Sequence, residues 1–253
     1  MAFLYQFLLR LSFGLAAAMA LTDSRLVTSG YYRNNLYVLL GLDVLASLVA
    51  WSAPVEAALP FWPAVVAAGL CYVGAVMWLY NLHRPGTLTL GLLGGVSLVA
   101  AWLAVPQPTG ASSTVRTLFQ LDPFAGGFLL GTTMAAMLLG HWYLNTPGMK
   151  LDPLKRLLKL MAAAVVIRMA FAAVALAVHF ANDGTLTPTQ ISLVTLRWLA
   201  GLVGPAVLAW MSWKTLLIPN TQSATGILYV GVIGVFLGEM TAALLSGELG
   251  FPL

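Results

Sequence analysis

Long apolar runs separated by short polar breaks dominate this chain. Each run approaches the roughly 20 residues that an α-helix needs to cross a hydrocarbon core about 30 Å thick. Barrel strands would be about half as long and would alternate in polarity, so we expect helices. The breaks carry proline, glycine, asparagine, threonine and charged residues, as loops do. The pattern predicts eight membrane-spanning helices over residues 3–21, 36–53, 62–80, 88–105, 125–144, 157–180, 191–213 and 224–246.

We therefore expect an all-α fold, a polytopic transmembrane helix bundle in which residues 1–253 form a single integral membrane domain. The first apolar run ends in small residues, as a signal peptide does before its cleavage site. A signal peptide, however, has basic residues before its apolar core, whereas Arg10 lies inside the core here. The first run is therefore predicted to be a retained helix.

Basic side chains lie almost entirely on one side of the predicted bundle. The breaks after the first, third, fifth and seventh helices hold most of them, and the opposite loops hold only Arg116. Lysine and arginine favour the cytoplasmic side, so both termini are predicted to face outward. The residues on the predicted cytoplasmic side are Arg25, Arg33, Arg84, Lys150, Lys155, Arg156, Lys159 and Lys214.

The composition agrees with a membrane protein. Apolar residues make up 60% of the chain and charged residues 8%, compared with about 25% charged in soluble domains. The net charge of +4 is explained by the cytoplasmic loops, so we expect the lipid bilayer as a partner and no nucleic acid. A single cysteine, Cys71, excludes a covalently attached c-type haem. The predicted location is a bacterial cytoplasmic (inner) membrane, crossed many times.

Apart from Lys159 at the cytoplasmic edge of its span, five charged residues fall within the predicted spans, where each costs about 2.5–3.5 kcal/mol at the centre of the bilayer. They are Arg10, Asp43, Arg168, Arg197 and Glu239. Arg197 and Glu239 lie at similar depths on neighbouring helices, which predicts an ion pair between them. Such a pair either fixes the register of the helices or serves a proton or quinone headgroup site. The excess of arginine over acid favours an anionic or carbonyl-rich guest, or an acid on a partner subunit.

A second group of candidates lies where the fifth helix meets the predicted cytoplasmic surface. The segment from Gly140 to Gly148 holds His141, Tyr143 and Asn145 before a Pro-Gly stop. The polar run before the last helix, which includes Gln222, lies on the same predicted side. These side chains are expected to line a quinone headgroup site or to hold another subunit. A helix-end histidine bonded to backbone or water is the alternative for His141.

Haem binding is a further alternative. A b-type haem takes two axial histidines at matching depth. His83 and His141 both lie near the predicted cytoplasmic ends of their helices, so they are the candidate ligands of the haem iron.

Two short motifs near the C-terminus resemble the membrane anchor subunits of polysulfide- and DMSO-reductase-type enzymes. They are Leu196-Arg197-Trp198 and Leu237-Gly238-Glu239-Met240, and the resemblance covers under a quarter of the chain. It implies a quinone-reactive protein without a haem of its own. A histidine on an earlier helix joins the quinone site in that family, and His141 is a loose counterpart.

The expected function is thus a membrane subunit of a bacterial respiratory or electron-transfer complex that contacts quinone, quinol or a partner's haem. If it belongs to an enzyme, it would be a non-catalytic or quinone-binding subunit of an oxidoreductase, and other subunits would be its partners. The expected carriers are Arg168, Arg197, Glu239 and His141. A small-solute transporter is one alternative, with Gly204-Pro205 as a candidate helix break. A purely structural membrane subunit is the other.

Overall fold

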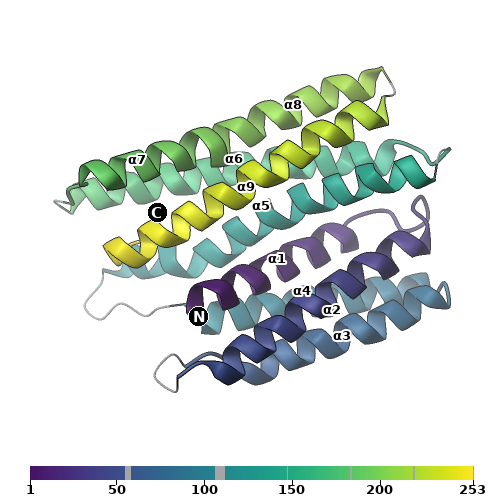
Figure 1. The fold of residues 1–253 in the computed structure, drawn as a ribbon, viewed down its shortest axis with the longest axis horizontal. Coiled ribbons are helices and arrows are strands. Elements are labelled where there is room, and N and C mark those ends of the chain that lie inside the picture. Colours follow the sequence, from purple (N-terminus) through teal and green to yellow (C-terminus); the bar gives the residue numbers. More distant parts are fainter. Residues whose placement is uncertain (55–57, 106–111, 147, 183, 219, 253) are drawn as a thin grey trace.

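The computed structural model describes residues 1–54, 58–105, 112–146, 148–182, 184–218 and 220–252. The described residues form helices and no strands, and eight helical stretches are long and apolar enough to cross a membrane. The predicted fold class is therefore confirmed, and the chain is a multi-pass membrane protein. Both termini lie at the same end of the molecule (Figure 1). The helices are α1 (Ala2–Ala20), α2 (Ser29–Ser52), α3 (Phe61–Leu79), α4 (His83–Leu103), α5 (Ser113–Asn145), α6 (Asp152–Ala181), α7 (Pro188–Leu196), η2 (Arg197–Val203), α8 (Gly204–Leu217) and α9 (Thr221–Leu249).

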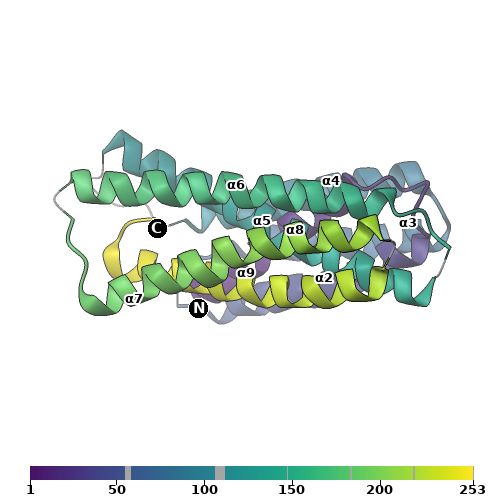
Figure 2. The ribbon, with the colours of Figure 1, turned by 90° about the horizontal axis from the view of Figure 1, so that it is seen from above.

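The spans form two four-helix bundles that lie side by side. In the first bundle α1 packs against α2 and α4, and α3 packs against the same two helices. In the second, α5 packs against α6 and α9, and α8 packs against the same two. Helices α7, η2 and α8 follow one another as a single span from Pro188 to Leu217. The bundles meet chiefly where α1 lies along α5 (Figures 1 and 2).

Glycines bring the backbones of α1 and α5 together. A Cβ atom on Gly14 would lie 1.8 Å from the carbonyl oxygen of Gly127, and one on Gly131 would lie 1.7 Å from the carbonyl carbon of Gly14. Small residues allow such close approach between membrane helices, where van der Waals packing replaces the hydrophobic effect. The joint between the bundles therefore depends on the absence of side chains at these positions.

Helix α5 begins much earlier than the predicted residue 125. The side chain of Ser112 caps its first turn by accepting a hydrogen bond from the backbone nitrogen of Val115. Pro123 lies inside the helix, so the Asp122-Pro123 step, which reads as a loop in sequence, is helical. The predicted outer loop over residues 106–124 is therefore wrong from 113 onward; residues 106–111 lie outside the described parts. Asp122 consequently lies inside the bundle.

The seventh span changes its winding at η2, which is a π-helical segment. It ends immediately before Gly204 and Pro205. Proline has no backbone N–H to donate to the preceding turn, so helical hydrogen bonding is interrupted here. Gly201 of this segment packs against α9, where its Cβ would lie 2.5 Å from the Cα of Gly238. The candidate break at Gly204-Pro205 thus coincides with a local irregularity, and π segments often mark functional sites.

Candidate functional site

Four helices contribute to one network of buried charges. Arg168 of α6 lies between two acids: its Nη1 is 2.6 Å from Oδ1 of Asp122 on α5, and its Nη2 is 2.7 Å from Oε2 of Glu239 on α9. Arg10 of α1 reaches the other oxygen of Asp122, with Nη1 2.6 Å from Oδ2. The Arg168 side chain is fully buried, and the other three are at most 14% exposed. The network therefore links both bundles through charge-assisted hydrogen bonds, which are strong where water is excluded.

Arg197 comes near this network but makes none of its bonds. Its side chain is buried, and its three guanidinium nitrogens have no hydrogen-bond partner among the described residues. The predicted ion pair between Arg197 and Glu239 is therefore wrong. Glu239 instead lies against Gly126 of α5, and its carboxylate is bound by Arg168 of α6.

Gly126 on α5 makes room for the pair. A Cβ atom there would lie 2.4 Å from Oε2 of Glu239 and 3.2 Å from Nη2 of Arg168. Glycine therefore lets the carboxylate and the guanidinium meet against the surface of α5, and a larger residue would force them to shift.

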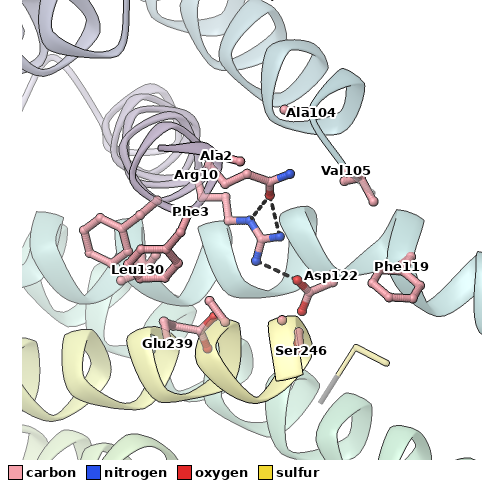
Figure 3. A pocket seen from close by; sticks show the side chains of 14 residues that line it. Ala2, Phe3, Arg10, Ala104, Val105, Phe119, Asp122, Leu130, Glu239 and Ser246 are labelled. Atoms are coloured by element: carbon pink, nitrogen blue, oxygen red, sulfur yellow. Dashed lines mark hydrogen bonds and ion pairs between the residues drawn. The ribbon is translucent and has the colours of Figure 1, made fainter. Parts of the chain in front are cut away.

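A cavity of about 240 Å³ adjoins the network, between the two bundles. Arg10, Asp122 and Glu239 form part of its wall (Figure 3). The residues that line it come from α1, the end of α4, α5 and α9, and they include Ala2 and Ser246 near the two termini. It therefore lies toward the end of the molecule that holds both termini. Its other lining residues are mostly apolar, among them Phe3, Phe7, Phe119 and Leu130.

Gln6 adds an amide to the wall of this cavity. Its Oε1 accepts hydrogen bonds from Nε and Nη2 of Arg10, at 3.1 and 2.7 Å. Its Nε2 is buried and has no hydrogen-bond partner among the described residues. Buried polar atoms are normally satisfied, so this donor fits an acceptor oxygen on a bound molecule.

The structure places the predicted site residues in two separate regions. Arg168 and Glu239 meet in the network, and Arg197 lies close to it. His141 lies 19 positions after Asp122 on α5, which is about 28 Å along a helix. Its Nδ1 is 3.2 Å from the hydroxyl of Tyr229 on α9.

Three further candidates belong to the region of His141. The hydroxyl of Tyr143 donates to the carbonyl of Lys150, while Asn145 and Gln222 are exposed. Pro147, in the same segment, lies outside the described residues. The region of His141 and the charged network are therefore too far apart for one small ring to contact both. A role for His141, Tyr143, Asn145 and Gln222 stays a prediction.

The two histidines considered for haem lie in different bundles. His83 opens α4 and packs edge-on against Trp78, with ring centroids 5.5 Å apart, whereas His141 contacts Tyr229. The described part of the chain has no group of three or more histidine, cysteine or acidic side chains arranged for a metal ion. Ligation of a haem by His83 and His141 stays a prediction.

Three residues of the site were not anticipated from the sequence: Asp122, Gln6 and Gly126. Asp122 falls between the predicted spans 88–105 and 125–144, so it was not counted among the charges within the membrane. Ser112 offered the available signal, since a serine before a helical stretch is a typical N-cap. Gln6 and Gly126 carry no signal of their own, because their roles depend on neighbours from other helices.

Comparison with protein-family models, with curated protein sequences and with solved structures finds no match for this chain.

Proposed function

We propose that this protein is a quinone-binding membrane subunit of a bacterial electron-transfer complex, located in the inner membrane with redox subunits as partners. The single observation that supports the proposal is the apolar cavity that ends on Arg10, Asp122 and Glu239. A membrane quinone matches this combination of apolar and charged walls, because it has an apolar tail and a polar ring whose oxygens accept hydrogen bonds.

The polar wall offers what a quinone headgroup needs. Gln6 Nε2 is a donor that no described residue uses, and Arg10 supplies positive charge beside it. Glu239 lines the same cavity and can exchange a proton when a ring oxygen gains or loses one, whereas Asp122 binds Arg10 and Arg168 and holds both guanidinium groups in place. When bound, the quinone itself supplies the redox chemistry, and the electrons come from a redox group of a partner subunit. The protein would orient the ring and handle its protons.

The charges of the network favour an electron-rich guest. Three arginines, Arg10, Arg168 and Arg197, face two acids, Asp122 and Glu239. Among the described residues, one positive charge of this network therefore has no acidic partner. An electron-rich oxygen in the cavity would be attracted by this excess, because Coulomb energies are large at low dielectric constant.

Transport of a small solute is the second candidate, and it has its own observation. The cavity lies between two bundles of equal helix number, and the π-helical η2 stands directly before Pro205 in the second. Transporters place their sites between repeated halves and use interrupted helices. This candidate predicts movement of a solute across the membrane, which quinone binding does not require.

The test is direct binding of a short-chain quinone. Protein purified in detergent is extracted with organic solvent for co-purified quinone and is then titrated with decylubiquinone. Ala243 lines the cavity, so Ala243→Phe should fill it and abolish binding. Ala163→Phe on α6 is the matched control, because Ala163 is exposed to the surroundings and should leave binding intact.

Two results would contradict the proposal. One is a purified protein that carries no quinone and binds no decylubiquinone. The other is equal binding by the Ala243→Phe and Ala163→Phe variants, which would place the quinone elsewhere. Uptake of a solute into liposomes, lost only with Ala243→Phe, would favour transport instead.

A further inference from the structure

The centre of the first bundle holds a second, separate polar cluster, with one residue from each of its four helices. Ser12 lies on α1, Asp43 on α2, Cys71 on α3 and Ser97 on α4, and all four have no exposed surface. The Ser12 hydroxyl donates to Oδ2 of Asp43 at 3.0 Å, and the Cys71 thiol donates to the same oxygen at 3.3 Å. The Ser97 hydroxyl donates to Ser12 at 3.3 Å. The hydrogen bonds therefore converge on one carboxyl group.

Asp43 has no basic partner among the described residues. Arg10 lies two positions before Ser12 on α1, but its guanidinium binds Asp122 and Gln6. Oδ1 of Asp43 is buried and has no hydrogen-bond partner in the described parts of the chain. A carboxylate that is isolated in a low-dielectric interior is so costly that it is normally neutralised. Something must therefore compensate the charge of Asp43.

A proton fits this position better than a metal ion. Hard cations such as Ca²⁺ or Mg²⁺ take about six or more oxygen ligands. The described side chains offer one carboxyl group and two hydroxyls, with a thiol as the fourth member. Both hydroxyls and the thiol direct their hydrogens along the chain of bonds that ends on Oδ2. A proton needs no space and would bind Oδ1, the oxygen that remains free.

The groups that face Asp43 from the neighbouring helices are otherwise neutral. They are Ser12 from α1, Cys71 from α3 and, through Ser12, Ser97 from α4. Among the described residues, Tyr5 of α1 is the other titratable side chain that interacts electrostatically with Asp43, and its hydroxyl donates to the carbonyl of Pro60. No neighbour described here thus supplies a positive charge at this point.

We propose that Asp43 is a proton-binding site, which holds a carboxylic acid inside the membrane at neutral pH. The proton adds to Oδ1, so the carboxylate becomes a neutral acid while Oδ2 keeps its bonds from Ser12 and Cys71. The site is distinct from the charged network that links the two bundles, and the proposal does not depend on quinone binding.

Cys71 provides a built-in reporter, because it is the only cysteine in the chain. Its S–H stretching band is therefore unique in the infrared spectrum of the protein. Hydrogen bonds to an ionised acceptor are stronger than those to a neutral one. The band should move to lower frequency when Asp43 loses its proton.

The experiment is infrared spectroscopy of the protein reconstituted in liposomes, recorded over a range of pH in choline chloride. At neutral pH we expect a carbonyl band of a protonated acid that shifts on Cys71→Ser and disappears in Asp43→Asn. Asp23→Asn is the control, because Asp23 is an exposed turn residue and its replacement should leave this band unchanged. The Cys71→Ser variant retains Asp43, so it provides the test even if Asp43→Asn does not fold.

The proposal is overturned if no carbonyl band responds to Cys71→Ser at any pH. It is also overturned if replacing choline by Na⁺ at constant pH shifts the S–H band of the unmodified protein and Asp43→Asn abolishes that shift. In that case a metal cation, and not a proton, would neutralise the carboxylate.

Discussion

Arg168 and Glu239 form a two-point ion pair in the interior of the second bundle. Nε of Arg168 donates to Oε1 of Glu239 at 2.8 Å, and Nη2 donates to Oε2 at 2.7 Å. The third nitrogen, Nη1, binds Asp122. The planar guanidinium therefore fixes α6 relative to both α9 and α5, and a lysine could not reproduce this geometry.

Replacing Arg168 by methionine should destabilise the protein strongly. The change would leave two buried carboxylates with one fewer partner, and breaking buried pairs in this way costs about 3–5 kcal/mol. Thermal unfolding in detergent should show a clearly lower midpoint. Arg156→Met, at an exposed position on the same helix, should change it little. Equal midpoints for the two variants would show that the pair contributes nothing to stability.

Replacing Arg197 by methionine should leave the stability of the protein unchanged or increase it, in contrast to the replacement of Arg168. Its guanidinium is buried without a bonded partner among the described residues, and removing it would balance the charges of the network. Exchange of a buried charge for an apolar side chain of similar size is often neutral or stabilising by about 1–4 kcal/mol. The unfolding midpoint in detergent should therefore stay the same or rise. A marked fall of the unfolding midpoint would indicate that Arg197 makes a stabilising interaction beyond the contacts described above.

Gly126→Ala should disturb the ion pair without removing any charge. The added methyl group would press on Oε2 of Glu239 and force the carboxylate away from Arg168. We expect a loss of about 1–3 kcal/mol, as in other overpacked sites. Gly41→Ala in α2 is the control, because a Cβ there meets nothing within 4 Å. It should be neutral or slightly stabilising, since alanine favours helices more than glycine does. A Gly126→Ala protein as stable as Gly41→Ala would contradict the tight packing.

The orientation of the chain can be tested by labelling. Gln222 lies in the first turn of α9, which follows the basic end of α8, and Thr185 lies in the connection from α6 to α7; both residues are exposed. Figure 1 shows the α6–α7 connection at the end of the molecule that holds both termini. If the basic end is cytoplasmic, a cysteine at 185 should react with a membrane-impermeant maleimide in intact cells, and a cysteine at 222 should react only after lysis. The native Cys71 is fully buried and should not react with the maleimide. The reverse pattern would place both termini in the cytoplasm.

The sequence carried enough information to predict the eight spans, because each apolar run must match the thickness of the bilayer. It also showed that Arg168 and Glu239 lie within those spans. It did not show that they meet, because depth along a helix says nothing about the direction in which a side chain points. The pairing with Arg197 failed for this reason. Asp122 was missed because it falls before the predicted start of the fifth span, and because its partners Arg10 and Arg168 come from other helices.

The unequal lengths of α1 and α5 have a consequence for the surrounding lipid. Helix α1 has 19 residues and α5 has 33, which corresponds to about 28 and 50 Å. The first matches an ordinary bilayer, whereas the second exceeds its apolar thickness by roughly 20 Å. Because α5 is largely buried and its first turns carry Arg116 and Asp122, its extra length is not an apolar surface facing lipid: the ends of the second bundle extend into the headgroup layer, or the bundle tilts. Membranes of different thickness should accordingly alter the tilt of one half of the molecule relative to the other.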